Sequence, residues 1–484
     1  MRSTTRALET VPMRTPDDQC VDRLRRAARP LRGDATDHDL LLEMVGHKSL
    51  VLLGEASHGS HEFYLQRARI TQRLIAEKGF HAVAIEGDWA DAARVNRHVR
   101  GSARPADRAV NAPPTEPAAA LAGFQRFPTW MWRNTVVAGF IDWLREFNSV
   151  RPMAVRTGFY GLDLYSLQGD MGAALDHLRE ADPASAKALR AQCVRFDAFG
   201  PDSEIHGLMN GLRAAPSCEA AVRAALAQLL QRGRQAADPG GAVDQEEARF
   251  DLAQNARLVK NGEHHCRAMC LGEMSCWNLR EQQMAEMLAE LHTHLAKRVA
   301  RPKIVVWAHN SHTGDARATE MGRLRGEQSL GQLVRQRQPD DCLLVGMTTH
   351  SGSVTAASDW DAPALQQRVR PALAGSVEQL LHDTGLPRFW LPLRPGSEAS
   401  EVLREPRLQR AIGVVYRPEA ERENHHFFSR AAEQFDALLH LDSTRALAPL
   451  SPEPAWRAGD GQPPTKESLL ALHGDMHEAF PTGL

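Results

Sequence analysis

The chain has 484 residues, of which 43% are hydrophobic and 24% are charged. This length exceeds that of one typical domain and the composition is that of a globular protein, so we expect two structural units with a sizeable core. The net charge of -2 and the pI near 6.9 exclude the strongly basic surface of a nucleic-acid-binding or anionic-membrane-binding chain. A neutral or amphiphilic small molecule is the expected partner.

The opening MRSTTRALETVPMRTPDDQ lacks the apolar core of a secretory signal, and no later run reaches membrane-spanning length. The cytoplasm is therefore the expected location. Seven cysteines at irregular spacings indicate reduced thiols rather than a disulfide framework. A helical run contains a small group of histidines and cysteines without the paired spacing of a zinc site, and we interpret them as ordinary helix residues: His264, His265, Cys266 and Cys270.

The first part of the chain leads into a buried strand. Residues 1–20 are expected to form a flexible arm, and apolar spacing predicts short helices at 21–29 and 39–45. The continuous apolar run at 50–53, closed by Gly54, is typical of an interior strand of a parallel sheet. This strand begins the predicted core.

A strand-helix-strand unit follows. Its helix can be capped by Ser57 or Ser60 and ends at Gly79, and its second strand covers 82–85. The two strands of such a unit point the same way, so their carboxyl ends lie at one edge of the sheet. We therefore expect that edge to collect the polar residues that follow the strands, namely Glu55, His58, Glu86 and Asp88.

The next elements are a helix at 89–99, a surface loop at 102–117 and a helix at 129–147. Helix packing is the expected role of three tryptophans, Trp130, Trp132 and Trp143. A third strand at 159–164 places Asp163 near another strand end.

The character of the chain then changes twice. Helical periodicity dominates 167–300, which we interpret as a helical subdomain inserted into the core and forming a cap over the active-site cleft. Sheet character returns in 301–450, with strands expected at 303–307, 342–347, 389–393, 412–416 and 437–441 and a helix at 377–382. The fold class is α/β, with a mostly parallel central sheet flanked by helices. Residues 1–166 and 301–450 form its two parts, and 451–484 form a C-terminal tail.

A second histidine pair follows a strand in the same way as the first. His309 and His312 come directly after the strand at 303–307. An imidazole takes and returns a proton near neutral pH, and a neighbouring carboxylate fixes its tautomer. Arg67, on the helix after the first turn, could orient a carboxylate or stabilise an oxyanion. His61 and His350 are interpreted as ordinary loop residues.

Absent motifs narrow the chemistry. The chain contains no Gly-x-Ser-x-Gly, no His-Glu-x-x-His and no phosphate-binding glycine-rich loop. These absences argue against a serine hydrolase, a zincin and ATP or NAD chemistry. Water activated by histidine and carboxylate, with or without a metal ion, remains.

A series of motifs carries a family resemblance. LLGEASHGSHEFYLQR, AVAIEGDWADAARVNRHVRG, FPTWMWRNTVVAGFIDWL, GFYGLDLYSL, SCWNLREQQMAEML, VVWAHNSHTGDARATEMG, IGVVYRPEAER and FDALLHLDSTRAL occur in this order. They resemble the erythromycin esterase family over about residues 50–464. Members of that family open the macrolactone ring of macrolide antibiotics by ester hydrolysis without a serine nucleophile.

The resemblance implies that His58 is the general base that activates water. It also implies that the other catalytic residues are Glu55, Arg67, Glu86, His309 and His312. Arg280 matches a family motif position on a helix over the cleft, and with Asp88 and Asp163 it is expected to bind substrate. The implied fold is an α/β core with a helical lobe.

The resulting hypothesis is a cytoplasmic carboxylic ester hydrolase that acts on a lactone or ester such as a macrolide, with a role in antibiotic resistance. No cofactor is expected. Two alternatives stay open. Three histidines and two carboxylates in one crevice could serve a metal-dependent hydrolase of another small molecule. A protein that binds a small molecule without turnover is the second alternative.

Overall fold

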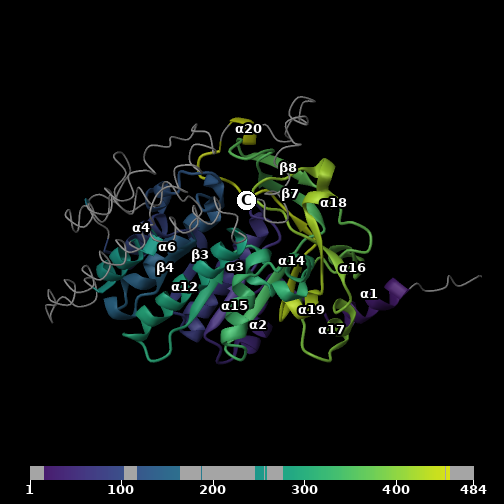
Figure 1. Ribbon diagram of the computed structural model, residues 1–484, viewed down its shortest axis with the longest axis horizontal. Coiled ribbons are helices and arrows are strands. Elements are labelled where there is room, and N and C mark those ends of the chain that lie inside the picture. The colour runs from purple at the N-terminus through teal and green to yellow at the C-terminus, as the bar shows by residue number, and fades with distance from the viewer. Residues whose placement is uncertain are drawn as a thin grey trace, which may run out of the picture.

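The computed structural model describes residues 16–102, 117–163, 187, 246–255, 257–258, 276–452 and 454–457. Within them, eight strands form one sheet in the order β1-β9-β12-β6-β2-β5-β3-β4 (Figure 1). The strands from β12 to β4 run parallel, whereas β9 is antiparallel to both of its neighbours. Their bounds are β1 Arg29–Pro30, β2 Leu50–Leu53, β3 Ala82–Asp88, β4 Gly158–Asp163, β5 Ile304–Trp307, β6 Cys342–Thr348, β9 Arg388–Pro392 and β12 Ala437–Leu441.

The central strands of the sheet are buried on both faces and consist mostly of apolar residues, whereas the edge strand β1 is exposed. Successive residues of β2 alternate between two hydrophobic clusters, with Val51 and Leu53 in one and Leu50 and Leu52 in the other. This two-sided burial explains the continuous apolar runs in the sequence. It confirms the predicted α/β class with a mostly parallel sheet.

Helices cover the two faces of the sheet. The helices that contribute apolar side chains to the cluster that contains Val51 include α2 Asp39–Val45, α3 His61–Lys78, α4 Trp89–Arg100 and α6 Thr135–Ser149. The opposite cluster is built with α1 Pro16–Ala27, α12 Cys276–Ala296, α15 Leu330–Arg337, α16 Val377–Asp383, α17 Glu398–Leu403 and α19 Ala431–Gln434. In Figure 1, α4, α6, α12 and β4 lie on the left and α1, α16 and α17 on the right.

Shorter elements complete the described part of the chain. Two strands pair as β10 Arg407–Arg410 and β11 His426–Ser429, and a small sheet joins β13 Ser443–Thr444, β7 Ser351–Ala356 and β8 Leu365–Val369. The short helices are α5 Pro117–Ala120, α13 Asn310–Thr313, α14 Glu320–Arg325, α18 Glu421–Asn424 and α20 Pro454–Arg457. None of the five short strands was predicted, since they lack the apolar runs of the central sheet.

The predicted bounds of the first strand and the predicted end of the helix after it are confirmed. β2 has the predicted bounds, and α3 ends at Gly79, which has the left-handed φ of 66° that glycine adopts readily. Ser60 occupies the N-cap position of α3, but its side chain makes no capping hydrogen bond and contacts the hydroxyl of Ser57 instead.

Three expectations are corrected. α1 begins at Pro16, inside the predicted arm. The helix expected at 129–147 is split, because Asn134 has an extended backbone and caps α6 by accepting a hydrogen bond from the Val137 N–H. The run at 412–416 makes only isolated bridges, Ser57 to Ile412 and Ala357 to Val415. Its apolar residues are buried in small hydrophobic clusters beside the central sheet rather than paired with a neighbouring strand.

The three tryptophans have the expected packing role. Trp130 and Trp132 are buried in apolar clusters, and Trp143 packs against one of them. Residues 103–116 of the predicted loop, most of the predicted helical subdomain, the His264 to Cys270 group and the end of the chain from 458 onward lie outside the described residues. No helix in the described ranges is long and apolar enough to cross a membrane.

Candidate active site

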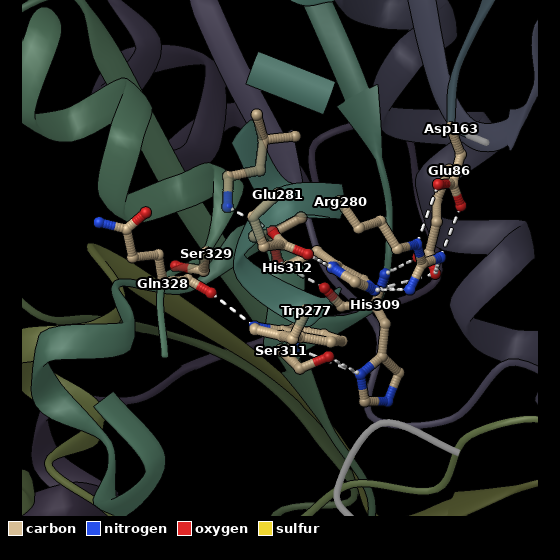
Figure 2. Close-up of polar contacts among 12 residues, drawn as sticks. Glu86, Asp163, Trp277, Arg280, Glu281, His309, Ser311, His312, Gln328 and Ser329 are labelled. Atoms are coloured by element: carbon tan, nitrogen blue, oxygen red, sulfur yellow. Dashed lines mark hydrogen bonds and ion pairs between the residues drawn. The ribbon is translucent and has the colours of Figure 1, made fainter. Parts of the chain in front are cut away.

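The predicted polar residues come from the carboxyl ends of neighbouring strands. Glu55 and His58 follow β2, His309 and His312 follow β5, and Glu86 lies near the end of β3. Because β5 lies between β2 and β3 in the sheet, all three strand ends meet at one edge. Helix α12 adds Arg280, Glu281 and Trp277 from the side, and Asp163 ends β4. Figure 2 shows the contacts among most of these residues.

His58 is held from one side by Glu55. The Nδ1 atom of His58 lies 3.0 Å from Oε1 of Glu55, and both side chains are buried. The other carboxylate oxygen of Glu55 lies 2.8 Å from Nη2 of Arg67, an ion pair that lacks the angles of a hydrogen bond. Arg67 is fully buried, and its guanidinium lies 4.3 Å from the ring centre of Tyr64. A buried arginine needs such partners.

The other ring nitrogen of His58 faces the strand end of β3. Because the carboxylate of Glu55 can only accept a hydrogen bond, Nδ1 of His58 carries the hydrogen and Nε2 is left with a lone pair. That Nε2 lies 3.7 Å from Oε1 of Glu86. This distance is too long for a direct hydrogen bond but lets both groups contact one water molecule.

Glu86 is surrounded by donors. Its Oε1 lies 3.1 Å from Nε2 of His312 and accepts a hydrogen bond from Nη2 of Arg280 at 3.2 Å. Its Oε2 accepts the backbone N–H of His309 at 2.7 Å. Burial alone would raise the pKa of Glu86, but His312, His58 and Arg280 together hold it well below its usual range. Glu86 is therefore a permanent carboxylate at neutral pH.

Arg280 links Glu86 to the end of β4. Its Nε and Nη2 donate to the two carboxylate oxygens of Asp163, the first at 2.9 Å. Burial would lower the pKa of Arg280, but Asp163 and Glu86 raise it above its ordinary value. A two-point contact of this kind fixes the plane of the guanidinium. Arg280 thus contacts both Asp163 and Glu86.

His312 contacts a carboxylate at each ring nitrogen. Nδ1 is hydrogen-bonded to Glu281, and Nε2 faces Glu86. Burial opposes the charge, but Glu281 and Glu86 raise the pKa of His312 to about 9. The imidazole also stacks on the indole of Trp277, with ring centres 4.7 Å apart (Figure 2). His312 is consequently a cation at neutral pH.

His309 differs from His312 in its hydrogen-bond partners and in its charge. It caps α13, with Nδ1 accepting from the N–H of Ser311 at 3.2 Å and lying 2.8 Å from its hydroxyl. Nε2 therefore carries the hydrogen. It is buried and completes no hydrogen bond within the described part of the chain, although the Ala56 carbonyl lies near the ring. Burial and the neighbouring His58 hold the pKa of His309 well below 6.5, so the ring is neutral.

The rings of His309 and His312, one neutral and one charged, also point in different directions. In Figure 2 the imidazole of His309 points away from the network of Glu86, Arg280 and His312. Its ring centre lies 4.9 Å from that of His58.

A small pocket of about 30 Å³ opens beside Glu86, which is room for one or two water molecules. Acidic and aromatic side chains line it, together with one arginine: Glu86, Asp88, Asp91, Arg126, Phe124, Phe127 and Trp132. Asp88 lies 3.5 Å from Nη1 of Arg126. Trp132 donates from its indole N–H to the Glu86 carbonyl at 3.1 Å.

The predicted residues form one connected group. Eight of the nine are linked by the contacts above, and Asp88 joins them through the pocket beside Glu86. His61 contributes a backbone contact to Arg445, and the ring of His350 stacks on His382 at 3.7 Å, away from the group. Sequence reasoning missed Glu281, Trp277 and Ser311. All three lie inside the quoted family motifs, next to or near residues that were chosen.

The arrangement of these side chains also bears on whether they could bind a metal ion. Within the ranges that the structure describes, no three side chains of histidine, cysteine, aspartate or glutamate are arranged to hold a metal ion. The polar atoms of Glu86 and His312 are directed at protein partners instead.

Comparison with known proteins places the chain among its relatives. The family described as "Erythromycin esterase" matches residues 75–444. The chain belongs to the erythromycin esterase family. A curated member, "Erythromycin esterase type II" of Escherichia coli, is 23% identical over 333 residues, which cover 66% of this chain and 73% of that protein.

Solved structures share the fold of this family member. A succinoglycan biosynthesis protein matches 90% of the chain and 99% of its own, with a TM-score of 0.66 and 19% identity. A Bacillus cereus protein covers 90% of the chain and 100% of its own, with a TM-score of 0.66 and 17% identity. A mutant erythromycin esterase in its open conformation covers 88% and 99%, with a TM-score of 0.55 and 15% identity.

Proposed function

We propose that this erythromycin esterase family member is a carboxylic ester hydrolase that opens a lactone or ester with water activated by His58. One observation carries the proposal. Nε2 of His58 lies 3.7 Å from Oε1 of Glu86, and the ring centre of His58 lies 4.9 Å from that of His309. A base, a carboxylate and a neutral N–H donor then meet where a water and an ester carbonyl can be placed.

The first step forms the bond between water and substrate. Nε2 of His58 removes a proton from a water that also donates a hydrogen bond to Glu86. The water oxygen attacks the carbonyl carbon, and the carbonyl oxygen becomes an oxyanion. When this intermediate collapses, the bond to the alcohol oxygen breaks, and His58 returns its proton to that oxygen. The products are a carboxylic acid and an alcohol, joined in one molecule when the substrate is a lactone.

His309 is the proposed oxyanion donor. Its Nε2–H is buried and completes no hydrogen bond within the described residues, and the capping contact at Nδ1 fixes its tautomer. A neutral imidazole gives no proton away at this point, so it stabilises the developing charge by a hydrogen bond. A donor so placed contributes on the order of 3 kcal/mol to transition-state stabilisation.

The remaining residues act through these groups in the proposed mechanism. Glu55 orients His58, and Arg67 pairs with Glu55 in a buried place. Arg67 contacts one protein carboxylate and His312 contacts two, so we assign both residues to support rather than to the oxyanion. Arg280, held by Asp163, likewise holds Glu86, while Asp88 borders the small pocket beside Glu86.

The names of the relatives suggest the substrate to try first. One curated relative and one solved structure carry the name erythromycin esterase, so a macrolide lactone is the leading candidate and simple esters come next. Mass spectrometry after incubation with erythromycin and with a series of aryl esters tests the proposal. Hydrolysis adds the mass of one water, whereas a binding protein without turnover returns the compound unchanged.

A chelator separates the water-only mechanism from a metal-dependent one. The metal content of the purified protein and its activity are measured before and after treatment with EDTA. Unchanged activity with no stoichiometric metal supports histidine-activated water. Loss of activity that returns with a divalent ion supports a metal-dependent hydrolase.

A further inference from the structure

His312 lies between two carboxylates, and only one of its ionisation states satisfies both. Nδ1 is hydrogen-bonded to Oε1 of Glu281, and Nε2 lies 3.1 Å from Oε1 of Glu86. A carboxylate oxygen accepts hydrogen bonds and cannot donate them when ionised. Nδ1 therefore carries a hydrogen, and the ion-pair distance from Nε2 to Glu86 favours a second one, which makes the ring an imidazolium.

Glu281 is itself held rigidly. Its Oε2 accepts the backbone N–H of Leu330 at 2.6 Å, at the start of α15, and the side chain is fully buried. Burial raises the pKa of Glu281, although His312 and Arg280 favour its ionised form. A carboxylate in this place stays ionised only while it has a cation beside it. Glu281 and His312 thus depend on each other.

Trp277 supports the same cation. It lies one helical turn before Glu281 on α12, so the two side chains share a face of the helix. Its indole lies at 19° to the ring of His312 (Figure 2) and donates from Nε1 to the Gln328 carbonyl at 2.6 Å. A flat aromatic face stabilises a neighbouring positive charge.

Other charged groups face His312 and partly oppose this arrangement. Nη1 of Arg280 lies 3.3 Å from Nε2 of His312 and disfavours a second cation. His309, at the same strand end as His312, and His58, after β2, are the nearby titratable histidines, and Glu86 is the carboxylate that both His58 and His312 face. The two carboxylates outweigh Arg280, since the pKa of His312 is raised to about 9.

We propose that Glu281 is a positioning residue that holds His312 as an imidazolium, so that His312 presents a fixed N–H to Glu86 in the reaction described above. The role rests on the proposed function. Through His312, Glu281 keeps Glu86 ionised and immobile beside Nε2 of His58. Loss of the Glu281 charge leaves a neutral His312, and Glu86 then keeps Arg280 but loses the other of its two neighbouring cations and competes for the proton that belongs to His58.

Glu281→Gln tests the proposal because it keeps the size of the side chain and removes its charge. Glu286→Gln is the matched control, since Glu286 is exposed on the same helix. The full-length protein is labelled with ¹⁵N-histidine, and the His312 ring signals are assigned as those lost in His312→Asn. Ring protonation is followed by NMR between pH 6 and 9.5, and kcat and KM for an ester that the protein turns over are measured at each pH.

The expected results are specific. In the unmodified protein His312 carries both hydrogens at pH 7.5 and titrates near 9. In Glu281→Gln it is neutral at pH 7.5, which needs its pKa to fall by about two units or more. We expect kcat to fall about tenfold or more and KM to change little. The loss of kcat is smaller at pH 6, where the ring regains its proton. Glu286→Gln matches the unmodified protein throughout.

Three outcomes overturn the proposal. The first is a neutral His312 at pH 7.5 in the unmodified protein, which needs no variant to observe. The second is a His312 that stays charged in Glu281→Gln. The third is a neutral His312 in this variant with full kcat. Absence of any ester turnover by the unmodified protein instead removes the proposed function, and the NMR titration still decides whether Glu281 keeps His312 charged.

Discussion

Oε1 of Glu55 lies 3.0 Å from Nδ1 of His58, three residues later in the same turn after β2. The second oxygen of Glu55 faces Arg67 at 2.8 Å. One short stretch of chain therefore supplies the base, the carboxylate that orients it and the cation that pairs with this carboxylate. The strand ends of β3 and β5 supply the rest.

His58→Gln is expected to remove ester hydrolysis while the fold persists. Glutamine still donates a hydrogen bond to Glu55, but it cannot take a proton from water. We expect kcat to fall by at least about a hundredfold and the free energy of unfolding to change by about 1 kcal/mol or less. Steady-state kinetics and urea unfolding measure the two. His61→Gln, in the same turn, serves as the control and keeps its activity; an active His58→Gln protein would remove His58 from the mechanism.

Glu55→Gln is expected to cost both activity and stability. The variant leaves the guanidinium of Arg67 buried without a counter-charge, which destabilises a protein by about 3–5 kcal/mol. The double variant Glu55→Gln with Arg67→Met should regain most of the stability and none of the activity, because His58 still lacks its carboxylate. Urea unfolding and ester turnover of the two single variants and the double variant check this. Equal stability of the single and double variants contradicts the role assigned to the ion pair.

His309→Asn is expected to lower kcat without unfolding the site. Asparagine keeps a side-chain acceptor at the N-cap of α13 but lacks the Nε2–H that faces the proposed oxyanion. Loss of one such donor lowers kcat by about a hundredfold to a thousandfold, with a smaller change in KM. Ser311→Ala, which removes only the hydroxyl contact to Nδ1, should have a much weaker effect. A full kcat in His309→Asn excludes this donor.

Stability is expected to fall between neutral and alkaline pH because of His312. Its pKa is raised from 6.5 to about 9 on folding, so the proton stabilises the folded state. This contribution is complete below pH 6.5 and is lost as the pH rises through 9. The shift corresponds to about 3 kcal/mol. Urea unfolding at pH 6.5 and 9.5 should show this decrease in the unmodified protein and a smaller one in His312→Asn. Equal slopes in the two proteins would assign the pH dependence to other groups.

Much of the core could be predicted because its signals are local. The apolar runs that form β2 and β12 have the predicted bounds, since a strand buried on both faces needs a continuous hydrophobic segment. Helix ends such as Gly79 follow from backbone conformation at one residue. The run at 412–416 has the same apolar pattern but forms no strand, because burial alone does not supply a neighbouring strand to pair with.

The sequence by itself determined which chemical groups this protein brings to the site: four carboxylates and three histidines near the ends of strands and two arginines on helices, all in recognisable motifs. Only the tertiary structure decided which of these groups contact one another and which of them are charged. The order of the strands places β5 between β2 and β3, and α12 brings Glu281 against His312, which lies far away in the sequence. These partners set the charge of each group, because in a buried site the energy of a charge depends on the neighbours that packing places around it.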